Sequence, residues 1–268
     1  MKFSKITLKS NEILPYRFLG SAIRGAFGSG LKDIVCINPS RVCNGCFAST
    51  GCLFYDFFES QNPKYRLNLD IGGRVEFDLM LFEESALKAP YVISALYKAF
   101  KEKGITKNRL KPDFRLYFNN ELIFDGVFKK FDNKMLEFDE NEVVSKEKAK
   151  LILKTPLRIK ENNHFVRNSV TLETILRSIY HRKLKLLNNS LQKLPFVPEY
   201  KIKYSDFSFI DFGRYSNRQK TKMKLGGVMG EIEFDYIDKN SYRLLKLGEI
   251  IGVGKQVTFG LGRIKVED

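Results

Sequence analysis

The sequence lacks the segments that mark membrane-spanning and secreted proteins. No apolar run approaches the roughly 18 residues that a membrane span needs. The first ten residues, MKFSKITLKS, contain neither an apolar core segment nor a small-residue cleavage site, so they do not resemble a signal peptide. We therefore expect a cytoplasmic protein that has no membrane partner.

The sequence also lacks both common nucleotide-binding motifs, although residues 252–266 (GVGKQVTFGLGRIKV) are rich in glycine. A P-loop would require glycine where Glu249 stands and a hydroxyl residue where Gln256 stands. A dinucleotide fingerprint would require a helix after the glycines, whereas residues 263–266 alternate like a strand. We expect no nucleotide cofactor and no catalytic metal.

The remaining interpretation is a loop whose glycines lack side chains, which lets the main chain approach another group closely. Lys255 and Arg263 are placed to attract an anion. The glycines of this loop are Gly252, Gly254, Gly260 and Gly262.

Histidine is scarce, with only two positions to consider. His164 lies in a turn-like stretch and is expected on the surface. His181 lies on a predicted helix, where Arg177, His181 and Lys185 recur every four residues and share one face. Neighbouring cations disfavour a further positive charge, which suits a proton acceptor. An ordinary exposed histidine is the other interpretation.

Cysteine is also scarce, and all four cysteines fall within seventeen residues, spaced C-x6-C-x2-C-x5-C. Four thiols are the number that a tetrahedral structural zinc site uses. An iron–sulfur cluster, oxidised pairs and unligated thiols are the alternatives. The predicted ligands are Cys36, Cys43, Cys46 and Cys52.

Acidic residues are too few to balance the basic ones, so the formal net charge is +15. Residues 146–268 hold 25 Lys and Arg against 13 Asp and Glu, and residues 1–145 hold 21 against 18. A basic surplus concentrated in one half is typical of a polyanion partner. A lysine-rich solvated surface is the alternative.

The densest basic run is RYSNRQKTKMK, residues 214–224, which contains no acid and leads into the glycine-bearing stretch LGGVMG. A tyrosine in the run adds a ring on which a base of single-stranded RNA can stack. We predict nucleic-acid contacts from Arg214, Tyr215, Arg218, Lys220, Lys222 and Lys224.

The hydrophobic pattern predicts the same order of elements twice. The first half gives a strand at 3–9, a helix from Pro15, a strand at 74–83, a helix at 86–103 and a hairpin turning at Asn119-Asn120. The second half gives strands at 151–160, 201–207 and 226–236, helices at 169–187 and 241–251, and a last strand. We predict an α+β protein of tandem ferredoxin-like domains (βαββαβ) with antiparallel sheets, at 1–145 with the cysteine insertion at 36–52, and at 146–268.

Three stretches together resemble one family. Residues 252–266 resemble the C-terminal glycine-rich motif of the CRISPR precursor-RNA processing endoribonucleases of the RAMP superfamily. Residues 214–234 are similar to the basic segment and glycine-bearing strand that precede that motif. Residues 18–36, followed by C-x2-C, resemble the N-terminal helix and cysteine region of one subgroup.

The resemblance implies two ferredoxin-like domains, a groove for CRISPR repeat RNA, and metal-independent cleavage by 2′-OH attack that leaves a 2′,3′-cyclic phosphate. Many members place a histidine, a tyrosine and a lysine around the first helix, but this chain has no histidine before His164. Tyr16, Arg24 and Lys32 are the comparable groups, with Tyr16 and Lys32 as catalytic candidates and Arg24 as an RNA contact. His181 is the remaining candidate base.

Two other functions stay open at this point. The chain could be a non-catalytic RAMP subunit that holds guide RNA beside other subunits of a CRISPR effector complex. It could also be a general zinc-stabilised nucleic-acid binder.

Overall fold

The chain folds into two compact units, residues 1–137 and 138–268. The structure is a computed structural model that describes residues 1–106, 108–161, 163–216 and 221–268, and at 214–216 and 221–223 it describes the backbone alone. The predicted boundary at 145/146 and the boundary between the units both lie within the charged segment 129–150. Among the described residues, no helix is long and apolar enough to cross a membrane.

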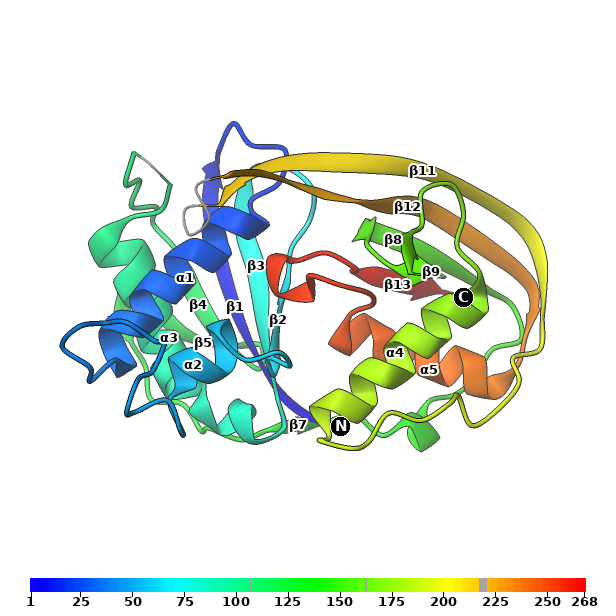
Figure 1. Ribbon diagram of the computed structural model, residues 1–268, viewed down its shortest axis with the longest axis horizontal. Coiled ribbons are helices and arrows are strands. Elements are labelled where there is room, and N and C mark those ends of the chain that lie inside the picture. The colour runs from blue at the N-terminus through cyan, green and yellow to red at the C-terminus, as the bar shows by residue number, and fades with distance from the viewer. Residues whose placement is uncertain (107, 162, 217–220) are drawn as a thin grey trace. The chain divides into compact units, whose positions relative to one another are not determined.

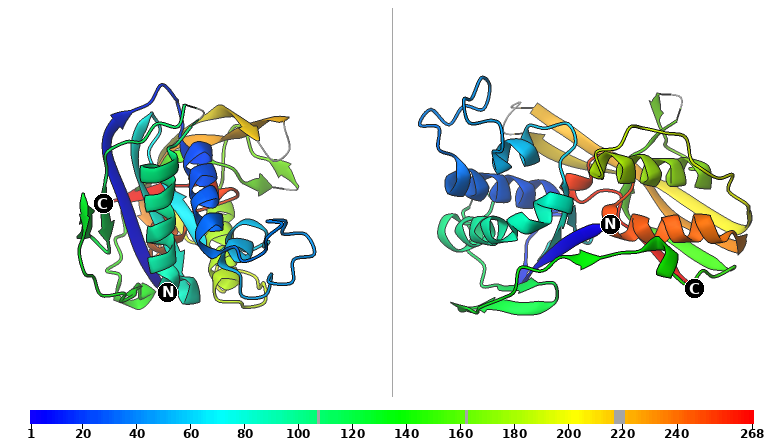
Figure 2. Two further views of the ribbon diagram at one scale, coloured as in Figure 1. Left: turned by 90° about the vertical axis from the view of Figure 1, so that its left-hand side faces the viewer. Right: turned by 90° about the horizontal axis from the view of Figure 1, so that it is seen from below.

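The amino-terminal unit contains an antiparallel sheet in the order β2-β3-β1-β4-β5-β6, with β7 also paired to β1. Its elements in chain order are β1 (Lys2–Ile13), α1 (Gly20–Val35), α2 (Leu53–Phe58), β2 (Tyr65–Asn68), β3 (Arg74–Phe82), η1 (Glu83–Lys88), α3 (Ala89–Tyr97), η2 (Lys98–Lys103), β4 (Arg115–Phe118), β5 (Glu121–Asp125), β6 (Val127–Phe128) and β7 (Leu136–Glu137). Helices α1 and α3 pack side by side (Figures 1 and 2).

The carboxy-terminal unit contains a four-stranded antiparallel sheet in the order β11-β12-β8-β13. Its elements are η3 (Glu140–Glu142), β8 (Ala149–Leu157), β9 (Lys160–Glu161), β10 (His164–Phe165), α4 (Leu172–Leu186), β11 (Tyr200–Ser216), β12 (Thr221–Ile237), α5 (Lys239–Ile251), η4 (Val257–Phe259) and β13 (Ile264–Glu267). Helices α4 and α5 pack together, and the long β11–β12 ribbon is drawn from yellow to orange in Figure 1.

The two units share one topology. In each, a strand and a helix are followed by two strands, a helix and a fourth strand, and the sheet order is second-third-first-fourth. This is the βαββαβ pattern, because the first and third strands lie in the middle and the helices serve as crossovers. The predicted α+β class with tandem ferredoxin-like units and antiparallel sheets is confirmed.

The apolar positions that the sequence pattern singles out form the cores. Ile6 and Leu8 of β1 are fully buried in one core cluster with Phe27 of α1. On α4, the predicted stripe is buried: Leu172, Ile175, Leu176 and Ile179. Removing such a side chain from water stabilises a fold by about 1.5–3 kcal/mol.

The first helix begins later than predicted. β1 continues to Ile13, and the N–H of Leu14 then donates to the carbonyl of Gly73 at 2.8 Å, so the chain remains beside the sheet. Residues 15–19 form a bend, and α1 starts at Gly20 rather than at Pro15. The predicted hairpin turn is confirmed, because Asn119 and Asn120 both have left-handed φ values of 48° and 75°.

Candidate nucleic-acid interface

The glycine-rich loop between α5 and β13 folds onto its own unit. Its glycines Gly252, Gly254, Gly260 and Gly262 have φ values of 81°, 78°, 86° and 68°, a region that favours glycine. A Cβ on Gly262 would lie 1.7 Å from the carbonyl oxygen of Val253, and one on Gly254 would lie 2.6 Å from that of Arg158. These two glycines therefore allow the loop to cross itself and to approach the end of β8.

Hydrogen bonds within the unit hold this loop on both sides. Lys255 N–H donates to the carbonyl of Arg158 at 2.8 Å, and Gly254 N–H donates to Ser178 Oγ on α4 at 2.9 Å. The hydroxyl of Thr155 donates to the Gly260 carbonyl at 2.9 Å and accepts from Arg263 N–H at 2.9 Å. These main-chain N–H groups are thus used inside the unit, and the loop presents the exposed side chain of Lys255.

Arg182 of α4 fixes the point where the loop begins. Its Nε donates to the carbonyl of Ile251, the last residue of α5, at 2.6 Å. Burial lowers the pKa of Arg182 to about 10, so the guanidinium still carries its charge at neutral pH. A cation at a helix C-terminus is also favoured by the helix dipole.

Arg158, at the end of β8, connects the glycine-rich loop to the β11–β12 ribbon. Its Nη1 donates to the carbonyl of Gly226 at 2.9 Å, and its guanidinium carbon lies 3.8 Å from the ring centroid of Phe165. A Cβ on Gly227 would lie 2.6 Å from the carbonyl of Leu157, so the glycine pair lets β12 approach this end of β8. Nothing in the sequence singles out Arg158, because an arginine that follows a strand belongs to no motif.

Further cations and rings continue from Arg158. The Lys160 ammonium lies 5.2 Å from the Phe165 ring centroid, and the Arg167 guanidinium lies 5.4 Å from that of Phe209. The two rings are 37% and 39% exposed. We call the group the cationic face; its members are Arg158, Lys160, Arg167, Lys224 and Lys255, with Phe165 and Phe209.

The predicted basic run is only partly covered by the described structure. Lys224 is exposed, and its ammonium lies 3.6 Å from the Asp211 carboxylate. Arg214, Tyr215 and Lys222 lie on β11 and β12, where the backbone pairs Arg214 with Met223 and Tyr215 with Lys222. Arg218 and Lys220 lie outside the described residues.

Of the three α4 residues that the sequence predicts on one helix face, two line a cavity and the third does not. Arg177 and His181 line a cavity of about 610 Å³ between α4 and the segment 191–198. The His181 Nε2 lies 3.1 Å from the Gln192 carbonyl, which can only accept, so Nε2 carries the proton. Lys185, one turn further along α4, is exposed and does not line this cavity.

In the amino-terminal unit, two predicted cations lie over rings of α2. The Arg24 guanidinium is 4.6 Å from the ring centroid of Phe58, and the Lys32 ammonium is 4.8 Å from that of Phe54. Tyr16 is 47% exposed in the bend before α1. The catalytic and RNA-contacting roles of these residues stay predictions.

The predicted four-cysteine zinc site is not supported. All four cysteines are free thiols, and the part of the chain that the structure describes contains no group of three or more His, Cys, Asp or Glu side chains able to hold a metal ion. Locally, Cys46 Sγ instead accepts from the side-chain amide of Asn38 at 3.3 Å. The prediction came from the number and spacing of the thiols alone, and a zinc site here stays a prediction.

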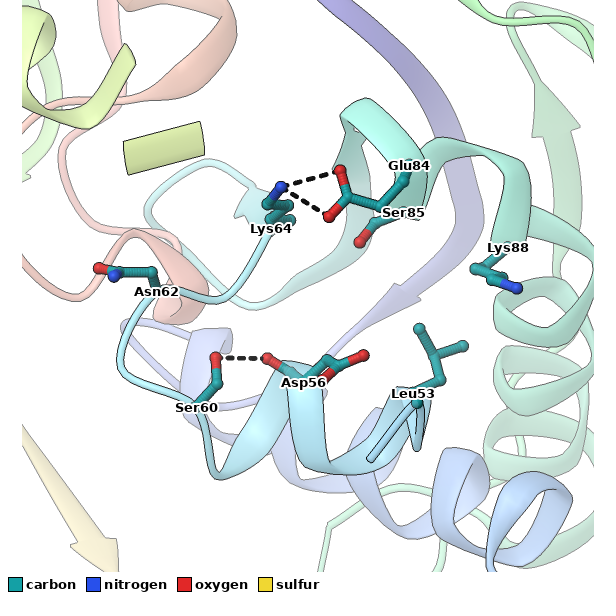
Figure 3. A pocket seen from close by; sticks show the side chains of 9 residues that line it. Leu53, Asp56, Ser60, Asn62, Lys64, Glu84, Ser85 and Lys88 are labelled. Carbon is teal, nitrogen blue, oxygen red and sulfur yellow. Dashed lines mark hydrogen bonds and ion pairs between the residues drawn. The ribbon is translucent and has the colours of Figure 1, made fainter. Parts of the chain in front are cut away.

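A smaller hollow of about 210 Å³ lies beside α2 (Figure 3). The Lys64 ammonium bonds both carboxylate oxygens of Glu84, at 2.6 and 2.8 Å, and the Ser60 hydroxyl donates to the Asp56 carbonyl at 2.8 Å. Burial and the nearby Glu84 charge raise the pKa of Asp56. Lys64 and Glu84 pair with each other, and the remaining charged residues, Asp56 and Lys88, are of opposite sign, so the lining has no surplus of positive charge to attract an anion.

Two family models match parts of the chain. Residues 151–264 match the family model of the CRISPR-associated endoribonuclease Cas6, and residues 4–70 match a model described as an N-terminal domain. An uncharacterized protein of Archaeoglobus fulgidus is 23% identical over 273 residues, which cover 93% of this chain and 91% of that protein.

Solved Cas6 structures have the same fold. A Thermus thermophilus Cas6 in a product complex is similar over 100% of this chain and 99% of its own, with a TM-score of 0.61 and 15% identity. A second Cas6 product complex covers 100% of both chains, with a TM-score of 0.57 and 13% identity. The chain therefore has the fold of these Cas6 structures, and residues 151–264 of its carboxy-terminal unit match the Cas6 family model.

Proposed function

We propose that this protein binds CRISPR repeat RNA on the cationic face and cleaves it once, without a metal ion. The observation that carries this proposal is the cationic face itself, which lies in the unit that matches the Cas6 family model. Three cations over two half-exposed rings, together with the exposed Lys224 and Lys255, supply charge for phosphates and flat surfaces for bases. The Cas6 structures with this fold were solved as product and substrate-mimic complexes, which supports an RNA ligand.

The proposed chemistry is an attack of a ribose 2′-oxygen on the adjacent phosphorus. The new O2′–P bond forms while the P–O5′ bond breaks, which leaves a 2′,3′-cyclic phosphate and a 5′-hydroxyl. A base must accept the 2′-hydroxyl proton, and a donor must protonate the leaving 5′-oxygen. His181 is the candidate base, because its Nε2 proton is directed to the Gln192 carbonyl and its Nδ1 can accept a proton.

We expect labelled repeat RNA to be cut at one position in the presence of EDTA. A 2′-deoxy substitution before the cleaved phosphate should abolish the product, because the nucleophile is gone. His181→Ala should slow cleavage by about 10²-fold or more while affinity changes little. His164→Ala removes the other imidazole and is the matched control, with an unchanged rate. Cleavage that requires Mg²⁺, or that survives the deoxy substitution, would refute this mechanism.

Arg158→Gln should weaken RNA binding about tenfold, because it removes a charged group and its hydrogen bond to Gly226. The slope of log affinity against log salt concentration should fall by about 0.7 for one lost phosphate contact with a single strand. Fluorescence anisotropy at several salt concentrations measures both quantities. Lys154→Gln, which changes an exposed cation on β8, is the control for total charge. Equal salt slopes in the two variants would show that Arg158 does not contact an RNA phosphate.

One observation favours a second function, that of a non-catalytic subunit that holds guide RNA. The amino-terminal unit contains no histidine, and its cations Arg24 and Lys32 lie over phenylalanine rings. A chain found in a partial Cas6-RT-Cas1–Cas2 complex has the same fold over 99% of this chain and 46% of its own length, with a TM-score of 0.53 and 12% identity. Tight, repeat-specific binding without any cleavage would establish this second function.

A further inference from the structure

The cavity beside α4 is large enough for a small ligand. Its volume of about 610 Å³ falls in the range of about 300–1,000 Å³ that is typical of small-molecule sites. One wall consists of Glu173, Arg177 and His181 of α4, and the other consists of the segment 191–198. The cavity belongs entirely to the carboxy-terminal unit and does not include the cationic face.

The cations of this cavity lack acidic partners within the described residues. Neither Arg177 nor Lys193 forms an ion pair there. Glu173 is one helical turn before Arg177, at a spacing that often gives an ion pair. Both of its carboxylate oxygens instead accept from the Tyr200 hydroxyl, at 2.9 and 3.0 Å. Burial and this hydrogen bond raise the pKa of Tyr200, so the hydroxyl keeps its proton. The two cations are therefore available to an anion from outside.

The opposite wall supplies apolar surface. Leu194, Phe196 and Pro198 are half-buried and line the cavity. The His181–Gln192 hydrogen bond ties this wall to α4 and leaves the His181 Nδ1 as an acceptor for a hydroxyl. The cavity thus combines two unpaired cations, one acceptor and an aromatic side chain.

We propose that this cavity binds a nucleoside monophosphate group. The phosphate would lie between Arg177 and Lys193, and the base would lie against Phe196 and Leu194. Inorganic phosphate alone would leave the apolar wall and most of the volume unfilled, and an apolar ligand would leave both cations unpaired. The group can arrive as a free mononucleotide or as the phosphorylated end of an RNA strand. The cavity shares His181 with the proposed cleavage, but nucleotide affinity is measured without any cleavage, so either proposal can fail alone.

Calorimetric titration with uridine 3′-monophosphate tests the site directly. We expect binding with a dissociation constant below about 1 mM, and binding of uridine or of inorganic phosphate that is at least about tenfold weaker. Arg177→Gln should weaken nucleotide binding about tenfold or more, and Phe196→Ala should also weaken it. Lys239→Gln, an exposed cation of the same unit away from the cavity, should leave it unchanged.

The two histidines give a readout at the site that does not depend on any variant. The imidazole Cε1–H signal of His181 should shift on addition of the nucleotide, whereas that of His164 should not, and His164→Ala assigns the two signals. Competition by a 3′-phosphorylated oligonucleotide, but not by its 3′-hydroxyl form, would identify a strand end as the source. Competition by neither would identify a free mononucleotide. Equal binding by Arg177→Gln and the wild type, or phosphate binding as tight as nucleotide binding, would overturn the proposal.

Discussion

Gly262→Ala is expected to destabilise the carboxy-terminal unit by about 2–5 kcal/mol and to impair RNA binding with it. The new methyl group would lie 1.7 Å from the Val253 carbonyl oxygen, so the loop must move. The φ value of 68° adds strain for any residue with a Cβ. Denaturant unfolding gives the free energy. Hydrogen exchange at the Val253 amide, which donates to the Gly262 carbonyl at 2.9 Å, reports on the loop itself.

Gly213→Ala is the matched control within the same unit. Gly213 is exposed on β11, its φ is not positive, and a Cβ there would meet nothing within 4 Å. The free energy of unfolding of this variant should differ from that of the wild type by no more than about 0.5 kcal/mol. If both alanine variants lost the same stability, the close approach of the loop to itself could not be the cause.

Gly30→Ala is expected to destabilise the amino-terminal unit, although alanine is the better helix former. The new methyl group would lie 2.2 Å from the Ala95 carbonyl oxygen and 3.1 Å from the Ala99 Cβ. Because α1 and α3 pack together, the helices must separate, and overpacking of this kind costs about 1–3 kcal/mol. Thermal and denaturant unfolding, followed by circular dichroism, measure the loss.

Gly25→Ala on the same helix should have the opposite sign. Gly25 is exposed, and a Cβ there would meet nothing within 4 Å. Alanine should therefore stabilise α1 by about 0.5–1 kcal/mol through its helix propensity. A loss of stability in both variants would show that something other than the α1–α3 contact governs Gly30.

The sequence predicted the fold well, because hydrophobic periodicity and turn-forming residues are features of short stretches of sequence. The α4 stripe from Leu172 to Ile179 identified a helix whose buried face is the predicted one. Asn119 and Asn120 identified a hairpin, because these residues tolerate left-handed φ. The strand lengths were harder to predict. β11 and β12 each span 17 residues. Charged residues do not end these strands, because they can pair across them, as the Lys203 ammonium and the Glu233 carboxylate do at 2.7 Å.

The candidate site was less predictable, because its contacts join residues far apart in the chain. The glycine motif predicted the loop between α5 and β13, but the sequence could not show that Gly254 accommodates the Arg158 carbonyl. Arg158 and Gly226 are 68 residues apart, and no local pattern reports their hydrogen bond. The cysteine spacing illustrates the converse case, since among the described residues no three of these thiols form a group able to hold a metal ion, although they are close in sequence.

The pairing of β8 with both β12 and β13 has a consequence for folding during synthesis. Leu151 and Leu153 of β8 pair with Val266 and Ile264 of β13, so one edge of β8 stays unpaired until the ribosome has released residues beyond 264. The sheet of residues 1–137 draws all its strands from residues translated earlier. We therefore expect the amino-terminal sheet to form co-translationally. The carboxy-terminal sheet should form later, because β8 and β13 are far apart in sequence and such contacts form slowly.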